Sequence, residues 1–422
     1  MAKVHSPRKS RAAPAETIED VVGAGLCAGC GLCASIAGPA VSMGINIEGH
    51  MRPLVRDEIP DEANSLIMAT CPGVAVRGPG RPDGVTVHPV WGPIREMHRS
   101  WSSDSVVRHK AAAGGTLTAF GSYLLASGRV DAVLHVRADV QKPWLTTATV
   151  SRTPDEVLGG AQSRYGPSSP LVEVHRLLEQ GKPFALIAKP CDISAVRALG
   201  HIDPRVGQLI PYMLTNFCGG VHSAHISKAV LRHHDVDEQE VDLFRHRGEG
   251  WPGPLRVRTR DGVVYDLKYG HAYGGKKYGY ELQFRCKICP DAVGEVADIS
   301  VPDGWILRDG KPIYEEAPGT NVAVVRTRAG EDLMHAAIAA GYLEVSPVSV
   351  QELEQMHTNH PDRKAGASVT FFALRLMGQR TIKATGYRVI DGLKRAGVRG
   401  AFKQLAGTVR RVIARENREH LI

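Results

Sequence analysis

The chain has 422 residues, of which 43% are hydrophobic and 23% are charged; this excludes general disorder and exceeds what one ordinary hydrophobic core accommodates. Its net charge of +8 equals the surplus carried by residues 380–422, where eleven Lys or Arg stand against three acidic residues. The rest of the chain is near neutral, so we expect no polyanion-binding face on the folded core and no nucleic acid as partner.

Residues 1–19 are polar and lack the apolar stretch of a secretory signal, so we expect a disordered leader there. No stretch of the chain approaches the roughly 18 uninterrupted apolar residues that a membrane-spanning helix needs. We therefore predict a cytoplasmic protein.

Residues 20–90 contain four cysteines, many glycines and prolines, and little periodicity, which is typical of a segment held together by metal coordination. The cysteines form a C-x-x-C-x-x-C run followed by a Cys-Pro pair: Cys27, Cys30, Cys33 and Cys71. Such a run places three thiolates on one cofactor with a fourth from elsewhere, which favours an iron–sulfur cluster. A structural zinc site and unligated thiols are the alternatives. Disulfides are not expected in a reducing compartment.

From residue 91 onward, short apolar runs alternate with stretches of helical periodicity, which favours an α/β sheet. Helices are predicted within 111–125, over 173–180, over 192–199 with Asp192 as its cap, over 330–340 and over 348–356. Strands are predicted over 130–136, 183–188 and 321–326. Two strand-like runs flank the turn Asp261-Gly262 and predict an antiparallel hairpin of 255–260 with 263–268.

The other four cysteines are spread over this region: Cys191, Cys218, Cys286 and Cys289. A lone cysteine such as Cys191 or Cys218 is more often a small buried hydrophobe than a ligand. The pair Cys286-x-x-Cys289 before a proline is more often a metal pair than a redox dithiol. These four cysteines are the second set, and Cys27, Cys30, Cys33 and Cys71 are the first. Spacing by itself does not decide whether the second set binds a metal.

Gly114-Gly115-Thr116 stands at the start of a predicted helix. Backbone N–H groups at such a helix start suit the phosphates of a dinucleotide. The alternative is a tight turn with Thr116 as the helix cap. A second segment without a clear role is the aromatic and glycine-rich stretch 271–280, which is either a substrate lid or a surface loop.

Residues 346–422 end in apolar residues at helical spacing with Lys and Arg between them, which predicts a helical basic tail. This tail either packs on its own protein or docks an acidic redox partner such as ferredoxin or an anionic membrane surface.

Several segments together resemble the family of coenzyme F-420 hydrogenase and dehydrogenase beta subunits, which includes reductases of chlorophyll intermediates. They occur in the family's order and cover roughly residues 20–310: 113–118 (AGGTLT), 128–133 (GRVDAV), 162–165 (QSRY), 189–193 (KPCDI), 216–219 (NFCG), and 285–291 (RCKICPD) leading to 297–301 (ADISV). Family members are flavoproteins with four-iron clusters that pass electrons between ferredoxin-like centres and an organic acceptor at FAD.

The resemblance implies that both cysteine sets hold 4Fe-4S clusters. It also implies an FAD site made by Gly114, Gly115, Thr116, Ser163, Arg164, Tyr165 and Lys189. Arg164 would pair with phosphate, Tyr165 would stack on the flavin ring, and Lys189 would hold charge at its pyrimidine edge.

The chain departs from the family in two places. Pro302 stands before Asp303 where the family commonly has glycine, which leaves the substrate open, and the N-terminal segment lacks a second full ferredoxin motif, which limits the clusters to two.

We thus predict a mixed-sheet α/β flavin-binding core in two parts, 91–175 and 176–345, after a ferredoxin-like iron–sulfur segment over 20–90 and before the helical basic tail over 346–422. The predicted function is an oxidoreductase that passes electrons from a ferredoxin-like donor through two 4Fe-4S clusters to FAD and on to a small organic acceptor. The alternatives are an electron-relay subunit of a larger complex and a zinc-organised nucleic-acid-binding protein.

Overall fold

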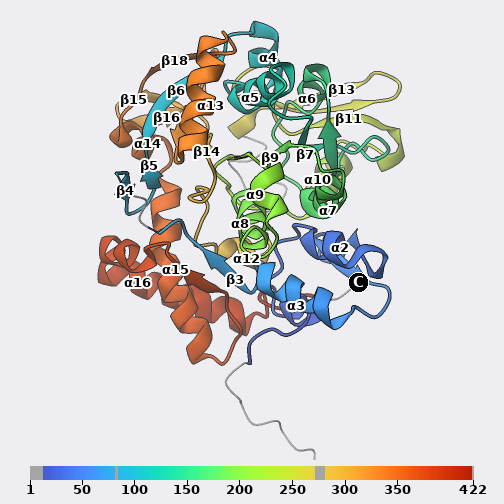
Figure 1. Cartoon of the computed structure of the whole chain (residues 1–422), viewed down its shortest axis with the longest axis vertical. Helices are drawn as coiled ribbons and strands as arrows, with labels where there is room; N and C mark the ends of the chain where they lie inside the picture. Colours follow the sequence, from blue (N-terminus) through green and yellow to red (C-terminus); the bar gives the residue numbers. More distant parts are fainter. Residues whose placement is uncertain (1–12, 81–83, 271–280, 421–422) are drawn as a thin grey trace, which may run out of the picture.

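The computed structural model describes residues 13–80, 84–270 and 281–420, so the stretch 271–280 lies outside the described residues. Its centre is a mixed sheet of eight strands in the order β18-β6-β17-β14-β10-β9-β7-β8. Figure 1 labels five of them, β18, β6, β14, β9 and β7. The strands are β6 (Glu96–Ser102), β7 (Ala132–Ala138), β8 (Thr146–Ser151), β9 (Phe184–Ile187), β10 (Tyr212–Thr215), β14 (Ile299–Ser300), β17 (Asn321–Val325) and β18 (Leu343–Pro347). The predicted mixed α/β architecture is confirmed, and one sheet draws strands from both predicted parts of the core.

The middle of this sheet is parallel and its two sides are antiparallel. Strands β7, β9, β10 and β14 run parallel, whereas β8 at one edge and β17, β6 and β18 at the other pair antiparallel. Alternate residues of β9 enter different cores, because Phe184 and Leu186 pack with one set of helices and Ala185 and Ile187 with another.

The helices cover both faces of the sheet. Residues of α5 (Thr116–Ala126), α6 (Pro154–Gly159) and α13 (Arg328–Ala339) share one buried cluster with the strands. Residues of α7 (Val174–Glu179), α8 (Pro190–Leu199) and α9 (Arg205–Leu209) share the other, together with Cys30 and Leu32 from the N-terminal segment. One cysteine of the first set, Cys30, thus packs in the core of the sheet domain.

A smaller sheet of β11 (Val241–Arg245), β12 (Leu255–Thr259) and β13 (Val264–Leu267) packs against α10 (Ala224–His233). The predicted hairpin is confirmed, since β12 and β13 pair antiparallel. The remaining short elements are α4 (Ser105–Lys110), α12 (Phe284–Lys287), β4 (Thr86–His88), β5 (Gly92–Ile94), β15 (Ile306–Arg308), β16 (Lys311–Ile313), η1 (Gly38–Ala40), η2 (Pro170–Glu173) and η3 (Glu238–Glu240).

The N-terminal segment contains α1 (Ile18–Gly23), α2 (Leu32–Ala37), β1 (Val41–Ile45), β2 (Met51–Val55), α3 (Asp61–Thr70) and β3 (Ala75–Arg77). Helix α1 begins inside the stretch expected to be a leader, because Thr17 caps it and Ile18 is buried.

The C-terminal region contains α14 (Val350–Met356), α15 (Asn359–Leu376), β19 (Lys383–Thr385) and α16 (Val389–Ile413). Helices α15 and α16 lie side by side (Figure 1), and Gln404 of α16 donates a 2.8 Å hydrogen bond to Thr370 of α15. Strand β19 pairs parallel with β3, so this region is built onto the N-terminal segment. None of the helices among the described residues is long and apolar enough to cross a bilayer.

Most predicted elements are present with shifted ends, and the predicted cap of the helix over 192–199, Asp192, was wrong. Helix α8 begins at Pro190 with Lys189 as its cap, and Asp192 lies in the first turn, where its carboxylate accepts the Lys189 backbone N–H at 3.2 Å. Helix α5 is capped by Gly115, whose φ of 77° suits glycine, and Thr116 is its first residue.

Candidate functional site

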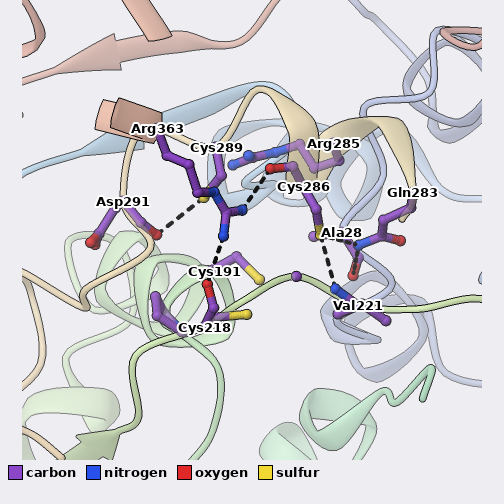
Figure 2. Close-up of a pocket in the computed structure, with 12 residues that line it drawn as sticks. Ala28, Cys191, Cys218, Val221, Gln283, Arg285, Cys286, Cys289, Asp291 and Arg363 are labelled. Carbon is purple, nitrogen blue, oxygen red and sulfur yellow. Dashed lines mark hydrogen bonds between the residues drawn. The ribbon is translucent and has the colours of Figure 1, made fainter. Parts of the chain in front are cut away.

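Four cysteines that are distant in sequence line one cavity (Figure 2): Cys191, Cys218, Cys286 and Cys289. Cys191 is the second residue of α8, directly after β9, and Cys218 follows β10. Because β9 and β10 are neighbouring parallel strands, their carboxyl ends bring both cysteines to the same edge of the sheet. Cys286 lies in α12 and Cys289 just beyond it, so this short helix completes the second set.

Polar groups surround the sulfur atoms of this set. The Cys286 Sγ accepts hydrogen bonds from the Val221 backbone N–H and from Nε2 of Gln283, both at 3.3 Å. Arg363 of α15 donates to the carbonyl oxygens of Cys218 at 3.0 Å and Cys286 at 2.8 Å (Figure 2). Burial raises the pKa of the Cys218 thiol to about 12, so any group that binds this sulfur as a thiolate must displace its proton.

The first set lies in the N-terminal segment: Cys27 and Cys30 are in the loop between α1 and α2, Cys33 is in α2, and Cys71 directly follows α3. Gly29 and Gly31 in this loop have φ angles of 71° and 87°, and a Cβ atom on Gly31 would lie 2.7 Å from Cγ1 of Val172. Glycine therefore allows the loop to turn between its cysteines. Burial and the neighbouring Cys27 raise the pKa of the Cys71 thiol to about 11, which places Cys71 within electrostatic reach of the run.

A buried ion pair lies within electrostatic reach of cysteines of both sets. The Asp192 carboxylate is fully buried and lies 2.8 Å from Nζ of Lys189, which also donates to Oγ of Ser168 at 3.1 Å. Burial and then the Asp192 charge raise the pKa of the thiols of Cys30 and Cys191, which belong to different sets. Lys189, which the family resemblance assigns to the flavin, thus lies beside cysteines of both sets.

A second polar link joins the two sets. Ala28, between two cysteines of the first set, lines the cavity of the second. Its carbonyl oxygen accepts a 3.4 Å hydrogen bond from Gln283, whose Oε1 accepts one at 3.1 Å from Arg52 of β2. Within the described part of the chain, no three His, Cys, Asp or Glu side chains are placed to ligate a single metal ion, so the ligation of either set stays a proposal.

The predicted phosphate-binding turn packs against the sheet. A Cβ atom on Gly114 would lie 2.7 Å from the carbonyl oxygen of Ser100 in β6. The Thr116 hydroxyl lies 3.0 Å from Oγ of Ser100, and its backbone N–H donates to Oδ1 of Asn321 at 3.3 Å. These contacts favour the alternative of a tight turn, because the turn's close approaches are made to β6 and β17.

The guanidinium of Arg164 holds the surrounding loops together. It donates hydrogen bonds to five protein oxygens: Thr146 Oγ1 at 3.1 Å, Gln162 Oε1 at 3.2 Å, and the carbonyls of Phe244 at 2.7 Å, Pro143 at 2.9 Å and Leu145 at 2.5 Å. Because these bonds use the donors that a phosphate would need, they favour a structural role for Arg164 over the expected phosphate pairing.

Ser163 and Tyr165 are brought to Arg247, a residue that the sequence analysis missed. Ser163 forms an isolated antiparallel bridge with Arg247, and Nη1 of Arg247 donates to the Tyr165 hydroxyl at 3.1 Å. Nη2 of Arg247 donates to the Ala112 carbonyl at 2.7 Å, just before the glycine turn. Arg247 therefore gathers two of the three predicted flavin segments.

The surroundings of Arg247 are aromatic and acidic. The buried guanidinium lies 2.7 Å from Oδ2 of Asp303, the aspartate that follows the unusual Pro302. It also faces two aromatic rings, with centroids at 4.8 Å and 5.3 Å, those of Tyr269 and Trp305. No local sequence pattern signals this group, because its members come from distant segments.

Comparison with known proteins identifies the family. Models of the N-terminal and C-terminal parts of the coenzyme F420 hydrogenase/dehydrogenase beta subunit match residues 97–176 and 181–351. The chain belongs to this family of oxidoreductase subunits, as its sequence motifs predict.

Individual relatives are distant. The coenzyme F420-dependent sulfite reductase of Methanocaldococcus jannaschii is 25% identical over 335 residues, which are 76% of this chain and 47% of that protein. The coenzyme F420 hydrogenase subunit beta of Methanothermobacter thermautotrophicus is 25% identical over 276 residues, 61% of this chain and 86% of the relative. The chain thus spans less than half of the sulfite reductase.

A solved structure shares the fold. A chain of the F420-reducing nickel–iron hydrogenase complex from Methanosarcina barkeri matches 68% of this chain and 96% of its own length, with a TM-score of 0.53 and 21% identity.

Proposed function

We propose that the chain is an iron–sulfur flavoprotein oxidoreductase that passes electrons between a redox partner such as ferredoxin, two 4Fe-4S clusters, FAD and a small organic acceptor. The observation that carries the proposal is the cavity lined by Cys191, Cys218, Cys286 and Cys289, near the buried ion pair Lys189–Asp192, whose carboxylate charge also reaches Cys30 of the first set. A zinc-organised nucleic-acid-binding protein is the weaker reading, because the family consists of redox subunits.

The thiols of the first set would hold one cluster; they come from the loop before α2, from α2 itself and from the residue after α3. The thiols lining the cavity of Figure 2 would hold the other. Bound there, the clusters supply one-electron transfer, and a flavin supplies its conversion into two-electron chemistry. The protein orients the sulfur atom of Cys286 by hydrogen bonds from Val221 and Gln283, and the burial of Cys286 limits the access of water to it.

The proposal that the protein binds a flavin depends on the family resemblance. The contacts of Arg164 and Thr116 supply no open phosphate site, so we assign no step to these residues. Of the predicted flavin residues, Tyr165 and Ser163 beside Arg247 remain the proposed contacts.

Coenzyme F420 is the organic acceptor that we propose first, since the names of the hydrogenase, formate dehydrogenase and sulfite reductase relatives all include it. An electron-relay subunit of a larger complex is the second candidate. It is favoured by the names of relatives that are subunits and by the complex to which the M. barkeri chain belongs.

The test uses one cysteine of each set, so that each variant is the control for the other. In protein purified anaerobically, Cys30→Ala and Cys289→Ala should each lose close to half of the iron and sulfide while the other cluster keeps its spectrum. Zinc in place of iron, or iron content that neither substitution changes, would reject the proposal. Flavin content and reduction of coenzyme F420, measured on the same samples, test the acceptor separately.

A further inference from the structure

Arg285 carries a buried positive charge from the second cysteine set to the first. It lies in α12 next to Cys286, is only 2% exposed, and lines the cavity of the second set (Figure 2). Its Nε and Nη2 donate hydrogen bonds at 3.3 Å and 3.1 Å to the carbonyl oxygen of Pro72, the residue after Cys71. The side chain therefore bridges the segments that carry the two sets.

The charge of Arg285 acts on sulfur atoms of both sets. Burial disfavours the charge, but the thiolate forms of Cys289 and Cys191 would favour it, and the net effect raises the pKa of the guanidinium. In the other direction, Arg285 lowers the pKa of Cys27 and Cys71 against the larger effect of burial. One cation is thus within electrostatic reach of at least two cysteines in each set.

Among the described residues, no carboxylate forms an ion pair with Arg285. Other buried cations nearby have one, as Lys189 pairs with Asp192 and Arg52 with Glu419. Burying a cation without a counter-charge is unfavourable, because the cation loses its hydration without gaining an opposite charge. Ligated thiolates of either set would supply the negative charge that this position lacks.

We propose that Arg285 is a positioning residue for electron transfer between the two clusters: its guanidinium is the shared counter-charge of both and raises the reduction potential of each. This inference rests on the proposed function. When one electron passes, one cluster is oxidised and the other is reduced. Because the same cation attracts the electron on either cluster, the electron keeps this electrostatic stabilisation when it moves from one cluster to the other.

Arg285→Gln removes the charge while keeping hydrogen-bond donors for Pro72. In anaerobically purified full-length protein with iron and sulfide measured, a redox titration followed by electron paramagnetic resonance gives the midpoint potential of each cluster. We expect both potentials to become more negative in Arg285→Gln, and Arg285→Lys to restore most of the shift.

Arg363→Gln is the matched control, because Arg363 hydrogen-bonds to the carbonyls of Cys218 and Cys286 and so touches only the second set. It should move only one potential. If Arg285→Gln leaves both potentials unchanged at full iron content, or moves only one as Arg363→Gln does, the proposal is wrong.

Arg285→Gln can also lose iron altogether. In that case, iron retained by Arg285→Lys supports the counter-charge. If both variants lose iron while the circular dichroism spectrum is unchanged, the counter-charge role is overturned, because the site then requires the shape of the guanidinium and not only its charge. Wild-type protein that holds no clusters would reject the proposed function itself, whereas two clusters with potentials that Arg285 does not affect would reject only this inference.

Discussion

The substitution Glu419→Gln tests how firmly the C-terminus is fixed to the cysteine region. Glu419 forms an ion pair with Arg52 of β2, and the two side chains are 4% and 0% exposed. Arg52 also donates to the Met51 carbonyl at 2.7 Å and to Gln283 at 3.1 Å, which links it to the second cysteine set.

Removing one partner of a buried ion pair costs about 3–5 kcal/mol, because the other charge stays buried. Glutamine keeps an oxygen that accepts a hydrogen bond, so we expect the lower end, about 3 kcal/mol, or roughly 100-fold in the unfolding equilibrium. The control is Glu416→Gln in the same segment. Glu416 pairs with Lys287, and these side chains are 36% and 28% exposed, so the cost should stay below about 1 kcal/mol.

The assay is urea unfolding of the full-length protein, followed by tryptophan fluorescence and by iron release to a chelator. We expect a clearly lower midpoint and faster iron release for Glu419→Gln, with Glu416→Gln close to wild type. Equal shifts for the two variants would refute the argument that burial of the ion pair sets its contribution.

Three further outcomes are expected. Arg164→Ala should lower stability by about 1–3 kcal/mol in thermal or urea unfolding, because it leaves the partly buried carbonyls that Arg164 bonds without this donor; loss of FAD at unchanged stability would instead favour the phosphate role. Burial lowers the pKa of His135 to about 4 from its ordinary 6.5. As the pH drops from 7 to 5, this histidine is therefore protonated in the unfolded chain but not in the folded protein, and the free energy of unfolding falls by about 2 kcal/mol. His135→Gln should flatten that dependence in urea midpoints, and an equally steep loss would contradict it. Truncation after Gly378 should unfold the cysteine region and release iron, because it removes Ile382 and Tyr387 from the core shared with Leu26 and Phe284; intact clusters with only a salt-sensitive slowing of reduction by ferredoxin would favour a docking tail.

Local patterns were enough to predict much of this protein from its sequence. The alternation of apolar runs and helical periodicity predicts an α/β sheet, and the turn Asp261-Gly262 predicts the hairpin of β12 and β13, because both depend on neighbours in the chain. The C-x-x-C-x-x-C run carries its own geometry in the same way, since three cysteines on one short loop are held together by chain connectivity.

Tertiary structure alone decided which distant groups meet. Cys191 and Cys218 are ordinary lone cysteines by spacing, and they line one cavity because parallel strands β9 and β10 end at the same edge of the sheet. The role of an arginine is equally invisible in sequence, since a guanidinium takes its function from the acceptors around it. Arg164 donates hydrogen bonds to five protein oxygens. Arg285, by contrast, lies next to Cys286 of one set and donates to the carbonyl oxygen of Pro72, the residue after Cys71 of the other. Such contacts join segments far apart in the chain, so no local pattern predicts them.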